Sequence, residues 1–564
     1  MPALAADNLG LILRAAINEL DWFHYNMARA ETPSMEQEEQ FYLLQLGVTR
    51  LIRLSLEARS SFDVPTVLFR RDRSITTPVL KIAAGLGMIE HGRRIAQTTA
   101  TGLCHIELAG RNEFLFTLPA SIPDDDYYER VVSDHYRNES QRRFAELMNS
   151  EFGQKLGRNV EEVLTELVYP FHEHFIGYDA DPLLDGYFFG IASHEIQLFD
   201  GYDTFHYATK FAGIPFQKYV LALTYVLSLF ARHERFAEAL IKKVPTIKLE
   251  NVLTISSETS GFVESIKDAL DYFGSAYEGY EETTLEEARK IFEVLSVSRR
   301  STNLLARAGS PLPLMIQCSD HDHIRCQAAA GSSSMQFLLD SLRFHFPGDY
   351  DRHQRSRERS MQLAIKRVLN DGFPGLTYLE NIKIRLGGRV LTDIDLVAME
   401  EATGTVFLCQ LKHQELYGAN LHSRQVRTTR LRDDTSRWLS SVANWIETVG
   451  ETGIRQSLQL PRKFPPLSVY RLVISRHYAY PLKDLAQGDD TTYANWNQFF
   501  NAIELAKQQM PQDRKLADFM TLLKKYEAPG GTQEHLPEPD TEWIIRDLKF
   551  TIRQEQSPIE PKQP

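Results

Sequence analysis

The sequence predicts an α/β C-terminal domain, with a central mixed sheet flanked by helices, joined to a large, mainly α-helical N-terminal domain. Three observations predict it. Apolar residues recur at helical spacing over much of residues 1–346. Alternating apolar segments at 392–399 and 405–412 flank a short polar break, which is the pattern of a β-hairpin. With 564 residues, 43% of them hydrophobic, the chain is long enough for more than one buried core.

The N-terminal domain, residues 1–346, is expected to be mainly helical. Helical apolar spacing is found at 8–30, 37–56, 136–156, 159–173, 216–244 and 285–297. Near 70–120 a short helix at 74–86 is followed by alternating stretches at 94–97, 104–108 and 113–118. This element is either a small β insertion or winged-helix-like, and the β insertion is favoured because no recognition helix stands out. Protein partners or a second copy of the chain would bind through this domain.

One short segment offers four side chains of the kinds that bind zinc: Cys318, His321, His323 and Cys326. Residues 314–319 and 323–328 are predicted to be two strands around a tight turn. The four side chains would then be distributed along a hairpin instead of surrounding one ion, so a zinc site is disfavoured.

The C-terminal domain, residues 347–526, is justified element by element. A helix at 354–369 ends at Asn370, Asp371 and Gly372, with Pro374 beyond. The following elements are a strand at 378–386, the hairpin, a helix at 421–449, a buried strand at 468–475, and helices at 493–509 and 513–526. Residues 527–564 are expected to hold a linker, a short strand at 547–553 and a disordered, Pro-rich tail.

The hairpin brings four polar residues together. If its strands pair about a centre between Ala402 and Thr403, Asp395 lies opposite Gln410, and Asp393 lies opposite Lys412. Side chains two apart on a strand share a face, so all four would project to one side. The intervening residues, such as Ile394 and Leu396, would enter a core. Because such a polar cluster is costly to bury for structure alone, we interpret it as a site.

The residue types indicate the chemistry of that site. The Asp395 carboxylate and the Gln410 amide oxygen are hard ligands suited to Mg²⁺ or Mn²⁺, and Asp393 is an auxiliary ligand. Lys412 could position and deprotonate a water while stabilising charge on a phosphate. The alternative is a solvated hairpin face with an ordinary Asp–Lys pair.

Asp395 followed by Gln410 and Lys412 resembles the core motif of the PD-(D/E)xK nuclease superfamily, which includes restriction endonucleases, Holliday-junction resolvases and Mrr-like enzymes. The chain departs from the motif because Gln410 stands where the second acid is expected. This Gln-x-Lys form resembles the Mrr-like branch, although it removes one negative charge from the metal site. The resemblance covers about residues 352–475 and implies a restriction-endonuclease-like fold.

The superfamily often places a further Glu on the first helix, which makes Glu358 the candidate here. The alternative is that Glu358 simply pairs with Arg355 or Arg359 on a solvated helix face.

Charge favours a polyanionic partner locally. The whole chain has a net charge of −12, whereas residues 351–440 hold 15 Lys and Arg against 11 Asp and Glu. The arginines that would contact phosphates are Arg424, Arg427, Arg430, Arg355 and Arg359. DNA is the expected partner, and RNA is the alternative.

Other signals narrow the functional class. The longest apolar run, residues 219–231, is too short to span a bilayer and predicts a buried helix, so no membrane partner is expected. The start resembles no signal peptide, and the four cysteines have no framework spacing, so a cytoplasmic protein is expected. There is no phosphate-binding loop for ATP-driven translocation.

The sequence therefore predicts a Mg²⁺-dependent DNA nuclease, an endonuclease by its resemblance, in which Asp395, Gln410, Lys412 and Glu358 are catalytic. A helical domain attached to such a nuclease resembles the organisation of bacterial defence effectors. The alternative is a catalytically inactive nuclease fold that binds nucleic acid or assembles with partners.

Overall fold

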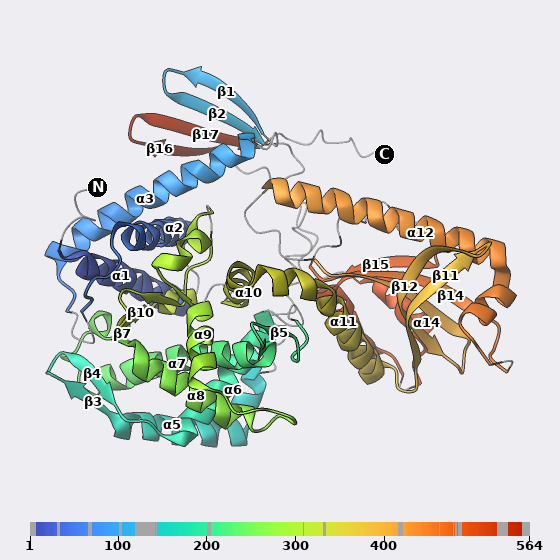
Figure 1. Ribbon diagram of the computed structural model, residues 1–564, viewed down its shortest axis with the longest axis horizontal. Coiled ribbons are helices and arrows are strands. Elements are labelled where there is room, and N and C mark those ends of the chain that lie inside the picture. Colours follow the sequence, from blue (N-terminus) through green and yellow to red (C-terminus); the bar gives the residue numbers. More distant parts are fainter. Residues whose placement is uncertain are drawn as a thin grey trace. The chain divides into compact units, whose positions relative to one another are not determined.

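The computed structural model is a mixed α/β protein (Figure 1). It describes residues 7–30, 34–65, 70–100, 104–118, 141–142, 144–199, 205–307, 310–330, 334–414, 421–461, 463–477, 479, 482, 485, 488–511, 513–526 and 540–554. Within these residues, no helix combines the length and the apolar character needed to cross a membrane.

The chain forms two compact units. The first comprises residues 1–96, 144–201 and 206–353, and the second comprises 97–143, 202–205 and 354–564. The longest segment of the second unit therefore begins within the helix α11 (Pro347–Gly372), and another segment of this unit, 97–143, comes from the N-terminal third of the sequence.

The first unit is built mainly from helices. It contains most of α3 (Arg73–Ala100), up to residue 96. Its other helices are α1 (Leu9–Arg29), α2 (Met35–Ala58), α5 (Glu151–Leu167), α6 (Pro182–Phe199), α7 (Phe216–Lys243), α8 (Thr259–Gly274), α9 (Leu285–Leu295) and α10 (Ser334–His345). The expected helix at 219–231 is the buried central part of α7, whose apolar residues pack against α5 and α6.

Short strands interrupt these helices. A four-stranded sheet has the order β7-β10-β9-β8, with β7 (Ile255–Glu258), β10 (Asp322–Arg325), β9 (Met315–Gln317) and β8 (Ser296–Val297). The hairpin expected around residues 320–322 is the β9–β10 pair. Two two-stranded ribbons add β3 (Val168–Phe171) with β4 (Phe175–Tyr178), and β5 (Lys210–Phe211) with β6 (Ile214–Pro215).

Three local predictions in this region are wrong. The helix expected at 159–173 ends at Leu167, and residues 168–171 form β3. Residues 94–97 are not extended, because α3 continues through them to Ala100. A helix does not run unbroken to 156: Ser150 has an extended backbone, and its hydroxyl caps α5 by accepting a hydrogen bond from the Gly153 N–H. Residues 136–140, the start of that predicted helix, lie outside the described residues.

The second unit contains a five-stranded mixed sheet in the order β11-β12-β13-β14-β15. The strands are β11 (Thr377–Leu386), β12 (Arg389–Glu400), β13 (Thr405–Lys412), β14 (Ser468–Ser475) and β15 (Thr491–Asn495). The first three are antiparallel, whereas β13, β14 and β15 are parallel. The parallel steps require crossovers, and the helix α12 (Leu421–Ser457) supplies the one between β13 and β14.

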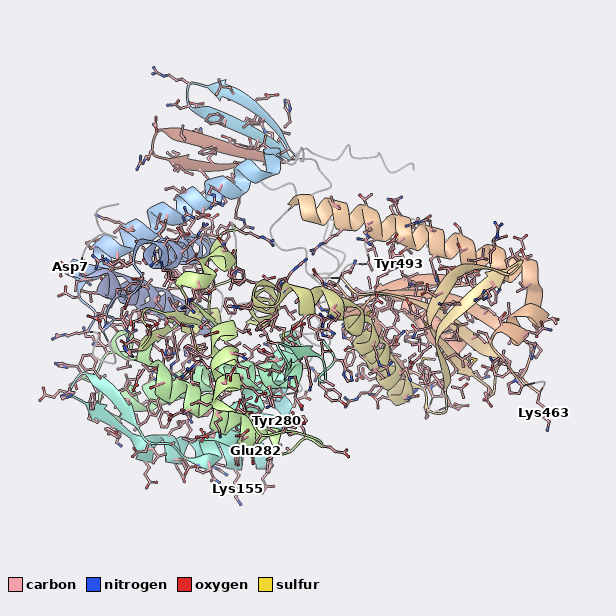
Figure 2. All side chains as sticks on the ribbon, in the orientation of Figure 1. Asp7, Lys155, Tyr280, Glu282, Lys463 and Tyr493 are labelled. Atoms are coloured by element: carbon pink, nitrogen blue, oxygen red, sulfur yellow. The ribbon has the colours of Figure 1, made fainter. Side chains whose placement is uncertain are left out.

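Helices cover both faces of this sheet (Figure 1). On one face α11 (Pro347–Gly372), α13 (Trp496–Gln509) and α14 (Leu516–Lys525) pack over a core that includes Phe407 and Trp496. On the other face α12 (Leu421–Ser457) packs over a core that includes Trp445 and Leu408. Tyr493, labelled in Figure 2, packs against this second core from β15. The predicted order of helix, three strands, helix and strand is confirmed.

A separate four-stranded sheet joins distant parts of the sequence. Its order is β1 (His105–Gly110), β2 (Glu113–Leu118), β17 (Leu548–Gln554) and β16 (Thr541–Ile545). β2 pairs with β17 in parallel, with Phe114 beside Phe550. The strand expected at 547–553 is therefore present as β17, and the β element expected near 105–118 is its partner. The linker and tail, 527–539 and 555–564, lie outside the described residues.

Candidate active site

The hairpin strands β12 and β13 separate just where the polar residues begin. Their backbone pairing runs from Glu400–Thr405 to Leu396–Cys409, in the predicted register, and ends there. Asp395 and Gln410, the next pair, are joined by side chains instead, because the Gln410 Nε2 donates to the Asp395 Oδ2 at 2.5 Å. The sheet therefore opens at this point and leaves room for polar groups.

The predicted alternation of side chains also shifts at Asp395. Ile394 and Val397, three residues apart, contact the same core beneath α12, whereas Leu396 contacts the opposite core. The prediction that Ile394 and Leu396 share a core is therefore wrong. The paired strand β11 is irregular at the same point: Asn381, which lies opposite Asp395, has a left-handed backbone with φ of 53°.

The expected pairing of Asp393 with Lys412 is wrong, because the β12–β13 ladder ends at Leu396 and Cys409. On the other edge of β12, Asp393 pairs with Lys383 of β11.

The side chain of Gln362 supports this irregular point from α11. Its buried Nε2 donates to the Asp395 backbone carbonyl at 2.9 Å and to the Asn381 Oδ1 at 3.1 Å. One amide group therefore fixes both strands at the residue that carries the carboxylate. Gln362 was not among the predicted residues, although its position one helical turn after Glu358 places both on one helix face.

The Asp395 carboxylate lies in a partly buried setting with a raised pKa. Desolvation by burial is the main cause, the neighbouring Asp393 and Glu358 carboxylates add to it, and the pKa rises to about 7. A hydrogen bond donated by the Leu411 N–H to the Asp395 Oδ2, 2.6 Å long, and the charge of Lys412 act in the opposite direction. A cation beside this carboxylate would relieve the cost of its charge.

The residues fit a hard divalent cation. The Gln410 side chain is 6% exposed, and its Oε1 is buried with no hydrogen-bond partner among the described residues. Such an oxygen normally requires a partner, and a metal ion would provide one. No three His, Cys, Asp or Glu side chains of the described residues converge to form a metal group by themselves. The site would therefore depend on the Gln410 amide oxygen beside the Asp395 carboxylate.

A cleft of about 570 Å³ lies beside these residues and has two walls. The sheet contributes Leu391, Thr392, Asp393, Gln410 and Lys412. The helix α12 contributes Asp434, Ser436, Arg437, Trp438, Ser440 and Ser441. The Trp438 Nε1 donates to the Asp393 backbone carbonyl at 2.8 Å, which ties the helix to the strand at the cleft. The α12 wall was missed from sequence, although positions 434, 437, 438 and 441 have the spacing of one helix face.

The remaining predicted residues are placed as follows. Glu358 lies on α11 with an exposed side chain, close enough to influence Asp395 electrostatically. Arg359 and Arg430 are exposed, and Arg427 is half-buried. None of these three arginines lines the cleft. The side chains of Arg355 and Arg424 lie outside the described residues.

The structure does not gather the possible zinc ligands around one point. Cys318 and Cys326 are buried, and burial raises the pKa of both thiols. The His323 ring packs against Phe262 and Phe292, whereas His321 is exposed. These side chains belong to the packing of the first unit.

Replacing the buried Gln362 by leucine is expected to lower the free energy of unfolding of the second unit by about 1–3 kcal/mol, because two part-buried hydrogen bonds are lost. The same change is expected to weaken Mg²⁺ binding, since Asp395 loses its support. Urea denaturation and calorimetric Mg²⁺ titration measure the two effects. The control is Leu363→Ala on the same helix, where the side chain is 41% exposed. Equal stability and equal Mg²⁺ affinity in Gln362→Leu and wild type would rule out this role.

No family model, curated protein or solved structure matches this chain. What the site does is therefore inferred from its residues and their geometry.

Proposed function

We propose that the second unit is a metal-dependent nuclease of the PD-(D/E)xK type that hydrolyses phosphodiester bonds of DNA. One observation carries the proposal: Asp395 and Gln410 are bonded side chain to side chain where β12 and β13 separate, with Lys412 two residues further along β13. The five-stranded mixed sheet with helices on both faces supports it, because a restriction-endonuclease-like fold is what the motif implies.

Asp395 and Gln410 would hold Mg²⁺ or Mn²⁺, with Asp393 as an auxiliary ligand and Glu358 completing the site. Bound there, the ion would act as a Lewis acid that stabilises charge on the scissile phosphate. The protein orients the Asp395 carboxylate before an ion binds. The Leu411 N–H and the Gln410 amide both donate to it, and Gln362 anchors the Asp395 backbone. This preorganisation is what a charged transition state requires.

Lys412, as the neutral amine, would position the attacking water at the cleft and accept its proton. A bond would then form between the water oxygen and the phosphorus, the bond to the leaving oxygen would break, and that oxygen would take up a proton from solvent. Lys412 is half-buried in the cleft wall, beside both the carboxylate cluster and the open space. In the charged form the same group would stabilise the phosphate.

The proposal is tested by incubating the full chain with supercoiled plasmid, single-stranded DNA and RNA, in Mg²⁺, in Mn²⁺ and in a chelator. Metal-dependent cleavage of DNA is the expected result. Cleavage of RNA alone would correct the substrate while retaining the chemistry. Absence of cleavage on every substrate in both metals would reject the nuclease.

A second candidate is favoured by one residue, Gln410. A neutral amide in place of the second acid weakens metal binding, so the fold could have been kept as a nucleic-acid-binding or assembly module. Binding of DNA that is equal with and without metal, and that is unaffected in Asp395→Asn, would favour this candidate. In either case the helical first unit would sense a signal or assemble with partners, as in the bacterial defence effectors that this organisation resembles.

Mg²⁺ affinity is expected to rise about tenfold between pH 6 and pH 8. The pKa of Asp395 is raised to about 7, so a proton occupies the carboxyl at the lower pH and must leave before the ion binds. Isothermal titration calorimetry at the two pH values measures the change, and the heat in buffers of different ionisation enthalpy reports the released proton. An affinity that is independent of pH would show that Asp395 is not a ligand.

A further inference from the structure

The cleft beside Gln410 and Lys412 has a charged residue on its opposite wall that the nuclease motif does not include. Arg437 projects from α12, and its side chain is 77% exposed. It forms an ion pair with Asp434, one helical turn earlier, which also lines the cleft. Lys412 and Arg437 therefore bring two cations to one cleft from two different elements, beside the carboxylates of Asp393 and Asp434. A bound metal ion at Asp393 and a phosphate at Arg437 would each compensate one of these charges.

The other polar groups of the cleft are mostly hydroxyls. Thr392 comes from β12, and Ser436, Ser440 and Ser441 come from α12. Hydroxyl groups donate hydrogen bonds to phosphate and sugar oxygens, which are the contacts that position a nucleic-acid backbone without reading its sequence. The chemistry of both walls thus suits a sugar–phosphate chain.

The cleft offers no surface on which a base could stack. Trp438 is the one aromatic residue among the described lining residues, and its side chain is 3% exposed. Its ring packs in the core beneath α12, and its Nε1 is engaged by the Asp393 carbonyl. Stacking of bases on aromatic side chains is a main source of binding energy in single-strand binding. Contacts with the bases would therefore add little binding energy in this cleft.

We propose that Arg437 is a phosphate-binding residue of this cleft, that the cleft recognises the polynucleotide backbone regardless of base identity, and that Asp434 holds Arg437 until a phosphate replaces it. The inference rests on the proposed function, since it assigns the substrate contact of the same site. A phosphate would displace the Asp434 carboxylate from an ion pair in which Arg437 is exposed and Asp434 is half-buried, and Asp434 would keep its second partner, Arg430.

The experiment measures binding of fluorescein-labelled 20-mers of oligo-dT, oligo-dA and mixed sequence to the full chain in a chelator, by fluorescence anisotropy at several salt concentrations. Arg437→Ala is expected to raise the Kd about tenfold and to reduce the slope of log K against log salt by about 0.7. Asp434→Asn is expected to lower the Kd a few-fold, because the competing carboxylate is gone. The control is Arg432→Ala, an exposed arginine of the same helix that lies outside the cleft.

Several results would overturn the inference: a Kd for Arg437→Ala equal to that of wild type, an equal loss in Arg432→Ala, or a more than tenfold preference for one base composition. Plasmid cleavage assayed in parallel separates this inference from the proposed function. If wild type does not cleave but Arg437→Ala loses binding, the nuclease fails and the backbone-binding cleft stands. If wild type cleaves and Arg437→Ala binds and cleaves equally well, the nuclease stands and the role of Arg437 fails.

Discussion

Replacing Lys412 by alanine is expected to lower the rate of plasmid cleavage by roughly 10²–10⁴-fold, the range found when a general acid–base or charge-stabilising group is lost. Lys412 contributes a proton acceptor and a positive charge, whereas Asp395 and Gln410 contribute the metal ligands. Mg²⁺ affinity should therefore be retained or increase slightly, since a nearby positive charge has been removed. The rate constant for plasmid nicking and a calorimetric Mg²⁺ titration measure the two quantities.

The matched control for this prediction is Lys383→Ala. Lys383 is an exposed lysine of the same sheet that pairs with Asp393 but does not line the cleft. We expect its cleavage rate to stay within about threefold of wild type, because its exposed charge lies outside the cleft and is screened. Cleavage by Lys412→Ala at the wild-type rate would remove Lys412 from the reaction.

Replacing Asp395 by asparagine is expected to abolish cleavage while making the metal-free protein more stable at pH 8. The amide keeps an oxygen for the Leu411 N–H but binds a divalent cation much less well than a carboxylate. Loss of the buried charge removes its desolvation cost. Stability and activity are thus expected to change in opposite directions, as at many functional sites.

The pH dependence of this gain has a defined sign. The pKa of Asp395 is raised in the folded state to about 7, so the stability contributed by its protonated form is fully present below about pH 4 and is lost as pH rises through 7. Relative to wild type, Asp395→Asn should therefore gain about 2 kcal/mol more at pH 8 than at pH 5.5. Urea denaturation in a chelator, followed by the fluorescence of the buried Trp438, Trp445 and Trp496, measures it. A stabilisation that is larger at the lower pH would contradict the assignment.

Four of the five strands in the second unit's sheet follow from local patterns and turn signals that agree. The fifth, β15, does not, and the prediction of a helix from 493 is wrong for 493–495, which are the last residues of β15. The polar break at 401–404 fixes the hairpin register, and Gly387 and Gly388, both with positive φ, turn β11 into β12. The buried strand β14 follows from its apolar run, and α12 follows from its helical spacing.

The details that shape the site could not be predicted from the same patterns. Alternation assumes a regular strand, whereas in β12 it shifts at Asp395, opposite the left-handed backbone of Asn381. The contacts of Gln362 and Trp438 depend on how helices pack across the sheet, which a local pattern does not contain. The pairing of β2 with β17 joins segments separated by most of the chain, and no short-range signal specifies it.

The most direct test of the central claim is the rate of supercoiled-plasmid cleavage by the full chain in Mg²⁺, measured side by side for wild type and Asp395→Asn, with a chelator control for each. We expect wild type to cleave the plasmid in Mg²⁺ and to stop in the chelator. We expect no cleavage by Asp395→Asn, although this variant folds at least as stably as wild type. Equal cleavage by both proteins, or cleavage that persists in the chelator, would contradict it.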